Sequence, residues 1–402
     1  MRLFPHLNFL KLSVIASASV LVLSACGGSD DPVVIAQPFK TLGNAQPLVV
    51  AHRGASGYLP EHTLEAYTRA IEQGADFVEP DLVATKDGVL IARHEPNITS
   101  TTNVAALPQF AARKTTKKVD GVDETGWFAS DFTLAEIKTL GALITDPERP
   151  QQFNGLYKIP TLQEIIDLVK AKRAATGREI GIYPETKHPT FHRQLGLGLE
   201  DRLITALNAA SWNSKTAPVL VQSFESGSLK EMRAKGLTTR MVQLIDGDDY
   251  DLKSGKVIYA APYDWAVNGD TRLFSAMVTP AGLAEIKTYA DGIGPWKPYI
   301  VPIKGALDAA GQLRDVNGDG KVNYNDASSQ PATTLITDAH KAGLFVHAYT
   351  FRNEQRRLAF DYNKDPKAEY LQFYRLGLDG LFSDFPDTAL EARSAYLREL
   401  GR

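Results

Sequence analysis

Short runs of hydrophobic, often β-branched residues alternate along the chain with longer stretches of helical periodicity. Four of the longer stretches are typical of amphipathic helices, and they cover residues 63–73, 161–172, 199–210 and 332–342. The hydrophobic runs have the length and composition of strands, at residues 48–51, 77–83, 180–184, 219–222, 241–245, 291–294, 344–349 and 380–384. Eight strands that alternate with helices predict an α/β fold built as a parallel (β/α)8 TIM barrel.

One further segment, residues 89–93, also has the composition of a strand. It follows Asp87-Gly88, and this dipeptide between two apolar runs is a strong hairpin signal. The segment is therefore expected to run back antiparallel along residues 83–86 rather than to join the barrel. A two-residue loop would place Lys86 opposite Val89 and, further along, His94 opposite Asp81.

Polar residues follow three of the predicted strands, where the carboxyl ends of barrel strands form the active face. These segments are His52-Arg53-Gly54, Glu79-Pro80-Asp81 and Glu185-Thr186-Lys187. Residues two apart on a strand point the same way, so both carboxylates of the second segment face one side. Three converging carboxylates would repel one another, and a hard divalent cation, Ca²⁺ or Mg²⁺, would neutralise them. The alternative is that they are exposed and paired with nearby lysine or arginine.

The hairpin brings His94 towards this acidic group, and the first strand brings His52 and Arg53. Such a set suits phosphodiester hydrolysis, because a metal and an arginine neutralise phosphate oxygens while one histidine accepts a proton and the other donates one. The residues do not indicate which histidine is the acid. A single histidine is more often structural, which is the interpretation for the other histidines of the chain, His62 among them.

The chain resembles the bacterial periplasmic glycerophosphodiester phosphodiesterases in segments that follow the family order. They are residues 51–57, 59–63, 79–81, 181–187, 222–224, 290–295 and 382–386. The resemblance implies a distorted (β/α)8 barrel with a small insertion subdomain at about residues 95–178. It also implies hydrolysis of small glycerophosphodiesters, such as glycerophosphocholine or glycerophosphoethanolamine, to sn-glycerol 3-phosphate and an alcohol.

The same resemblance assigns roles to individual residues. It places the metal on Glu79, Asp81 and Glu185, the acid/base pair on His52 and His94, and the phosphate contacts on Arg53 and Lys187. Glu95 follows His94 where the family more often has aspartate, which leaves the orientation of that histidine open. Two other functions stay possible: a lipid phosphodiesterase of the same fold that acts in the manner of phospholipase D relatives, and a surface lipoprotein that binds a ligand without catalysis.

A separate motif at residues 315–326 has the spacing of an EF-hand or dockerin calcium loop. Oxygen ligands fall at Asp315, Asn317 and Asp319, Gly320 provides the sharp turn, Lys321 offers its carbonyl, and Asp326 closes the loop. We expect a second, structural Ca²⁺ here; the alternative is a solvated turn.

The N-terminus has the architecture of an export signal. Basic Arg2 and Lys11 precede an apolar run at residues 12–23, which is too short for the roughly 20 residues of a membrane-spanning helix. Cys26, the one cysteine of the chain, follows Leu-Ser-Ala as in a bacterial lipobox. We therefore predict a lipoprotein signal peptide at 1–25, a flexible tether at 26–46, the catalytic barrel at 47–402, and a periplasmic or outer-membrane-attached lipoprotein that contacts the membrane through a lipid at Cys26. A soluble secreted protein and a retained membrane anchor are the alternatives.

The composition of the chain limits which classes of molecule it is expected to bind. The chain has 402 residues with 44 Lys and Arg against 47 Asp and Glu, a net charge of -3. This balance gives a polyanion no electrostatic attraction, so no nucleic-acid partner is expected. A single cysteine also excludes an intrachain disulfide framework. An exported location and all-oxygen ligands favour Ca²⁺ over Mg²⁺ at the catalytic site.

Overall fold

The computed structural model describes residues 36–402, and its barrel contains all eight predicted strands. These are β1 (Leu48–His52), β2 (Phe77–Glu79) with β3 (Asp81–Ala84), β7 (Gly181–Ile182) with β8 (Glu185–Thr186), β9 (Leu220–Ser223), β10 (Arg240–Ile245), β13 (Gly292–Pro295), β16 (Phe345–Phe351) and β17 (Gly380–Ser383). The predicted signal peptide and Cys26 lie outside the described residues.

Two of the barrel strands are interrupted by proline, which cannot donate to the ladder. Pro80 separates β2 from β3, and Pro184 precedes β8. The sheet order is β4-β3-β8-β9-β10-β13-β16-β17-β1-β2-β7. Since the order begins and ends on halves of the same two strands, the parallel sheet closes on itself. This confirms the α/β barrel and explains why it is distorted.

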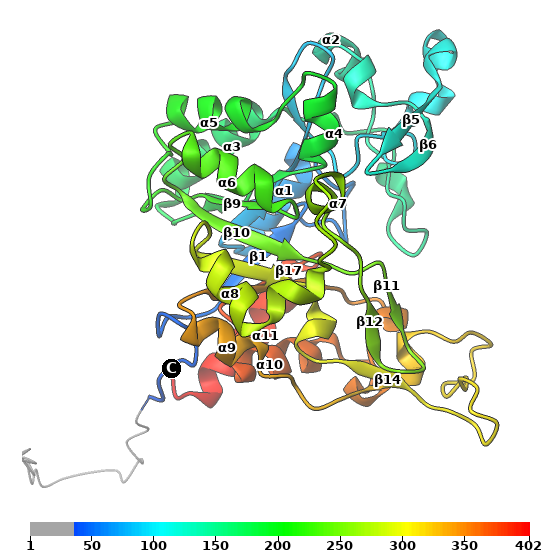
Figure 1. The fold of residues 1–402 in the computed structure, drawn as a ribbon, viewed down its shortest axis with the longest axis vertical. Helices are drawn as coiled ribbons and strands as arrows, with labels where there is room; N and C mark the ends of the chain where they lie inside the picture. The colour runs from blue at the N-terminus through cyan, green and yellow to red at the C-terminus, as the bar shows by residue number, and fades with distance from the viewer. Residues whose placement is uncertain (1–35) are drawn as a thin grey trace, which may run out of the picture. The chain divides into compact units, whose positions relative to one another are not determined.

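Helices cover the outside of the barrel (Figure 1). They are α1 (Leu64–Gln73), α3 (Leu162–Thr176), α4 (Pro189–Gln194), α5 (Glu200–Ala209), α6 (Ser226–Ala234), α8 (Pro280–Lys287), α9 (Leu335–Lys341), α10 (Pro366–Leu376) and α11 (Pro386–Glu399). The four predicted helices are thus α1, α3, α5 and α9. Their ends follow local chemistry: the hydroxyls of Thr63 and Thr161 cap α1 and α3, and Gly74 ends α1 with φ of 112°.

The core follows the two-residue period of the strands. Val50, together with Phe77, Leu220 and Val242, belongs to the small apolar cluster inside the barrel. The neighbouring Val49 and Ala51 belong to the large cluster between strands and helices. Buried polar side chains within the strands are few, Gln243 and His347 among them, whereas the acidic side chains Glu79, Asp81 and Glu185 lie at the carboxyl face.

The predicted hairpin exists, but its predicted register is wrong by one residue. β4 (Leu90–Ala92) pairs antiparallel with β3 so that Ala92 lies opposite Leu82. The Arg93 amide donates to the Asp81 carbonyl at 2.9 Å, which puts Arg93, not His94, opposite Asp81. The cause is a three-residue loop: the Thr85 amide donates to the Val89 carbonyl, and Gly88 takes a φ of 78°.

The insertion after β4 has its own small core. It contains β5 (Thr115–Val119), β6 (Val122–Gly126) and α2 (Leu134–Ile137), and its buried side chains include Trp127, Phe128 and Phe132. The predicted range of about 95–178 extends beyond this subdomain, because α3 at its end is a barrel helix that packs against α1.

Two more excursions leave the carboxyl face of the barrel. β11 (Asp249–Asp251), β12 (Lys256–Ile258) and α7 (Tyr263–Val267) follow β10. β14 (Ile303–Gly305) and β15 (Ala327–Ser329) follow β13 and enclose the loop at 315–326, so this loop comes after the sixth barrel strand.

The described part of the predicted tether, residues 36–46, is held against the C-terminal end of the domain. The Gln37 amide donates to the Leu400 carbonyl at 2.8 Å, and the Arg402 guanidinium lies 4.5 Å from the centre of the Phe39 ring. Residues 36–46 of the tether predicted for 26–46 therefore pack against the domain, and residues 26–35 lie outside the described part of the chain. Among residues 36–402 no helix is long and apolar enough to cross a membrane.

Candidate active site

Three buried carboxylates meet at the carboxyl end of the barrel. Asp81 and Glu185 are direct neighbours in the parallel register of β3 and β8, and Glu79 ends β2. One oxygen from each of the three groups lies within 4.8 Å of the others. All three side chains are almost completely buried. The predicted metal ligands are thus brought together by strand pairing.

The donor set fits a hard divalent cation. Asp81 Oδ1 is buried and has no hydrogen-bond partner. Burial, with Asp81 and Glu185 nearby, raises the pKa of Glu79 well above its ordinary value of 4.5. Burial also raises the pKa of Glu185 to about 8. Two of the carboxyls therefore tend to keep their protons in the metal-free protein, and a cation would release those protons.

Asp81 keeps the negative charge of the cluster. Although burial raises its pKa, the hydrogen bond from His62 and the nearby His94 and Lys187 hold it well below its ordinary value. His62 Nε2 lies 3.0 Å from Asp81 Oδ2, and His62 Nδ1 lies 2.8 Å from the Tyr67 hydroxyl. His62 thus positions a predicted metal ligand, a role that its isolated place in the sequence did not indicate.

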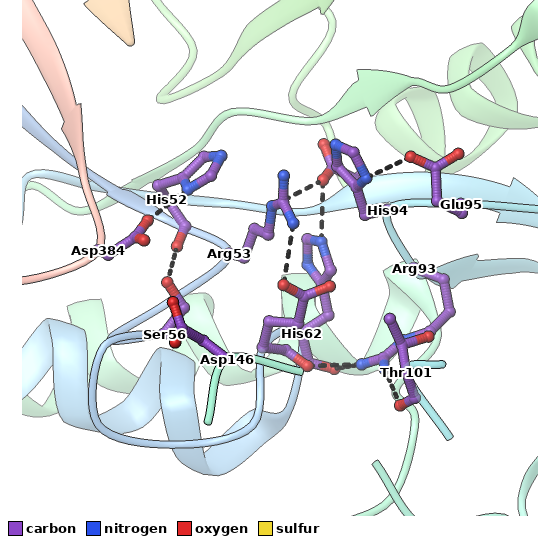
Figure 2. A network of polar contacts seen from close by, with 12 residues as sticks. His52, Arg53, Ser56, His62, Arg93, His94, Glu95, Thr101, Asp146 and Asp384 are labelled. Carbon is purple, nitrogen blue, oxygen red and sulfur yellow. Dashed lines mark hydrogen bonds and ion pairs between the residues drawn. The ribbon is translucent and has the colours of Figure 1, made fainter. Parts of the chain in front are cut away.

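Arg53 begins a left-handed turn at the end of β1, with φ of 59°. This conformation is unfavourable for a residue with a side chain, but it lets the Arg53 amide donate to Glu79 Oε2 at 2.7 Å. Its guanidinium binds Glu61 at 2.9 Å and lies 3.5 Å from Asp81. Figure 2 shows Arg53 between His52 and His94. A cation therefore lies beside the carboxylate cluster, where a phosphate would come.

His52 is oriented by a carboxylate from the opposite end of the chain. Its Nδ1 lies 2.5 Å from Asp384 Oδ1 (Figure 2). Arg149 and Arg352 bind the second oxygen of Asp384. Burial and the neighbouring Arg53 lower the pKa of His52 to about 4. The imidazole is neutral at pH 7, and its Nε2 remains available for proton transfer.

His94 has a similar arrangement despite the changed register. Its Nδ1 lies 2.6 Å from Glu95 Oε1, and its Nε2 lies 3.3 Å from Lys187 Nζ. Burial lowers the pKa of His94 to about 4 as well. Glu95 is itself held by His188 at 3.0 Å, so the glutamate that replaces the usual aspartate orients this histidine.

Arg93 fixes the hairpin beneath the site. Its guanidinium is fully buried and donates to the backbone carbonyls of Glu61, His62 and Thr101 (Figure 2). It joins the loop that carries His62 to the strand that precedes His94. The shift in register therefore creates a structural support that the sequence pattern did not predict.

All seven residues predicted for the catalytic site line one cavity of about 510 Å³. They are His52, Arg53, Glu79, Asp81, His94, Glu185 and Lys187. Lys187 forms an ion pair with Glu185 at 3.2 Å, and this pair helps to hold its pKa above the ordinary value despite burial. Trp127 and Phe128 of the insertion belong to buried cores and do not line the cavity.

The loop at 315–326 has a compact fold of its own. Asp315 accepts from the amides of Gly318 at 2.7 Å and Gly320 at 2.8 Å, and Asp319 accepts from the Lys321 amide at 2.9 Å. Asp326 accepts from the amide that follows Asp315, that of Val316, and closes the loop. The predicted turn at Gly320 has φ of 79°.

Comparison with known proteins identifies the family. The model of the glycerophosphoryl diester phosphodiesterase family matches residues 52–388. The chain belongs to this family. An Arabidopsis thaliana glycerophosphodiester phosphodiesterase is 36% identical over 359 residues, which cover 86% of this chain and 86% of that protein. One from Haemophilus influenzae is 30% identical over 414 residues, covering 96% of this chain and 98% of that protein.

Solved structures of family members show the same fold. The Oleispira antarctica phosphodiesterase, solved in complex with the product sn-glycerol-3-phosphate, aligns with a TM-score of 0.52 at 19% identity. The alignment covers 88% of this chain and 99% of the Oleispira antarctica chain. A glycerophosphodiester phosphodiesterase from Parabacteroides distasonis aligns with a TM-score of 0.50 at 15% identity, over 89% and 99% of the two chains. The protein is therefore a glycerophosphodiester phosphodiesterase by its family and its curated relatives, and these structures share its fold.

Proposed function

We propose that this phosphodiesterase hydrolyses small glycerophosphodiesters to sn-glycerol 3-phosphate and an alcohol, with a divalent metal and two histidines. The observation that carries this proposal is the cavity in which His52 and His94, each oriented through Nδ1 by a carboxylate, lie beside the acidic cluster. Glu79, Asp81 and Glu185 would hold the metal, with Ca²⁺ favoured over Mg²⁺. The metal would neutralise phosphate charge and make phosphorus more electrophilic.

The protein's own groups account for the proton transfers. The glycerol 2-hydroxyl of the substrate attacks phosphorus while one imidazole accepts its proton at Nε2 and the other donates a proton to the oxygen of the leaving alcohol. Water then opens the resulting cyclic phosphate to sn-glycerol 3-phosphate, with the two imidazoles in exchanged roles. Both histidines are neutral at pH 7 in the metal-free protein, which suits the base. A bound phosphodiester anion would favour the protonated form at the acid. Arg53 and Lys187 would bind the remaining phosphate oxygens.

Substrate turnover distinguishes this function from its two alternatives. The purified domain should release sn-glycerol 3-phosphate from glycerophosphocholine faster than it acts on micellar lysophosphatidylcholine. Preference for the micellar lipid would favour a lipid phosphodiesterase. Binding without turnover of either compound would favour a ligand-binding lipoprotein.

A second Ca²⁺ in the loop at 315–326 is part of the proposal. Its support is the set of oxygens from Asp315, Asn317 and Asp319 that the loop gathers around two left-handed glycines. We expect about two Ca²⁺ per wild-type chain and about one in Asp319→Ala, with turnover unchanged. Metal content measured by mass spectrometry after gel filtration checks this, with Asp123→Ala as an exposed control. An equal Ca²⁺ content in Asp319→Ala and Asp123→Ala would contradict a Ca²⁺ site in the loop.

Attachment to a membrane through Cys26 is the remaining proposal. Its support is the small-residue sequence before the single cysteine and the short apolar run that precedes it. In a bacterial host that processes lipoproteins, wild type should sediment with membranes and Cys26→Ser should become soluble. Ser29→Ala, three residues later, is the control. A Cys26→Ser protein that still sediments with membranes would contradict lipid attachment at this residue.

A further inference from the structure

The catalytic cavity has a side that the proposed proton transfers leave unused. Three acidic and several aromatic residues form it, and we call it the acidic-aromatic wall. It consists of Phe224, Glu225, Asp246, Asp248, Tyr263, Phe274 and Tyr349. It is built from residues that follow β9 and β10, from α7 and the turn after it, and from β16. A wall of this kind suits a positively charged organic group.

The cations that line the cavity already have carboxylate partners. Arg53 binds Glu61, Lys187 binds Glu185, and Arg352 binds Asp384. His188, whose pKa is raised to about 9 by Asp120 and Glu95 against the effect of burial, binds both of these carboxylates. Within the described residues 36–402, none of these cations forms an ion pair with Glu225, Asp246 or Asp248. One of them, Lys187, places its Nζ 5.4 Å from the centre of the Phe224 ring.

Asp246 is a half-buried carboxylate of this wall. It follows β10 directly and forms no ion pair with any residue of the described range 36–402. Glu225, in contrast, accepts hydrogen bonds from the Thr190 amide and hydroxyl. Burial raises the pKa of Asp246, although Gly247, Tyr349 and Lys187 oppose this. A cationic ligand would offset the free-energy cost of keeping this half-buried carboxylate charged.

Aromatic rings connect Asp246 with the metal cluster. Phe224 meets Phe274 edge to face at 6.2 Å and Tyr349 edge to face at 6.0 Å between ring centres. The Tyr349 hydroxyl donates to the carbonyl of Ile245, the residue before Asp246, at 2.9 Å, so this ring lies beside Asp246. A diester whose phosphate binds at the cluster would thus extend its alcohol along aromatic faces towards Asp246.

We propose that the acidic-aromatic wall binds the alcohol part of the substrate and selects glycerophosphodiesters whose alcohol carries an ammonium group. Asp246 supplies the opposite charge, and Phe224, Phe274 and Tyr349 supply ring faces for the methyl or methylene groups around the nitrogen. The glycerol part of the substrate carries no charge that a half-buried carboxylate would neutralise. The wall therefore fits the head-group alcohol of the diester rather than its glycerol. This inference rests on the proposed hydrolysis and adds a preference to it.

The test compares two diesters of glycerol 3-phosphate that differ in one charge: the choline diester, glycerophosphocholine, and the 3,3-dimethylbutyl diester, in which carbon replaces the nitrogen of choline. We expect wild type to prefer the choline diester by about tenfold in kcat/KM. Asp246→Asn, which keeps the size of the side chain, should lose this preference while its kcat/KM for the neutral diester stays within about twofold of wild type. Asp249→Asn, an exposed charge change nearby, should keep the wild-type preference.

The possible outcomes separate the two proposals. Equal kcat/KM of wild type for both diesters would overturn the preference and leave the hydrolysis intact. An equal loss of kcat/KM for both diesters in Asp246→Asn would also overturn the preference. The thermal melting temperature of the variant shows whether it is folded. Failure of wild type to hydrolyse either diester would refute the proposed function, and the preference with it.

Discussion

Replacing Glu79 with glutamine is expected to lower the turnover of glycerophosphocholine by about 10³-fold. The variant keeps the size of the side chain but removes one of three negative ligands, so the remaining carboxylates bind a divalent cation more weakly. Calorimetric titration of the metal-free protein should show weaker Ca²⁺ binding. At pH 7, wild type should release protons from both Glu79 and Glu185 on binding, because burial raises the pKa of each in the metal-free protein, and Glu79→Gln should release fewer.

The raised pKa of Glu79 also predicts how Glu79→Gln changes the thermal stability of the metal-free protein. The pKa of Glu79 in the folded metal-free protein lies well above 4.5, so the folded state binds more protons than the unfolded state at neutral pH. Protonated Glu79 therefore adds most to the free energy of unfolding below pH 4.5. This stabilisation is lost as the pH rises towards the pKa that Glu79 has in the folded protein. Glu79→Gln should melt no lower than wild type at pH 7 without metal. Glu72→Gln, exposed on α1, is the control, and undiminished turnover in Glu79→Gln would contradict the metal site.

Replacing either His52 or His94 with asparagine should lower kcat by about 10²- to 10⁴-fold, because each removes one of the two proton transfers. Metal content should stay at the wild-type level, which separates this effect from that of Glu79→Gln. Asp384→Asn should cost less, about 10- to 100-fold, since it weakens the orientation of His52 and the ion pairs with Arg149 and Arg352 but keeps the imidazole itself.

Steady-state kinetics with glycerophosphocholine check these histidine variants. His340→Asn, which loses a histidine–aspartate contact outside the cavity, should keep the wild-type kcat. Equal activity of wild type, His52→Asn and His94→Asn would show that proton transfer does not use these residues.

The sequence pattern predicts the barrel well because parallel strands are buried on both faces. Continuous apolar runs such as residues 48–51 are therefore visible without any knowledge of their partners. The placement of Glu79 beside Asp81 could be predicted for a similar reason, since residues two apart on a strand share a face. These local periods are sufficient to bring the carboxylates to one end of the barrel.

What the pattern missed depends on contacts between distant segments. Asp384 orients His52 across 332 positions of the chain, and no local period links the two residues. His62 looked structural in isolation, yet it binds Asp81 because the loop before α1 folds back over β3. The register of the hairpin depended on one residue of loop length, which the dipeptide Asp87-Gly88 does not determine.

The most direct test of metal-dependent hydrolysis at this site is restoration of activity in the metal-free enzyme. After removal of metal with a chelator and dialysis, the protein should release no sn-glycerol 3-phosphate from glycerophosphocholine. Adding Ca²⁺ should restore release in wild type and in Asp319→Ala, but not in Glu79→Gln. Full release by the metal-free wild type, or restoration in Glu79→Gln equal to that in wild type, would contradict the account.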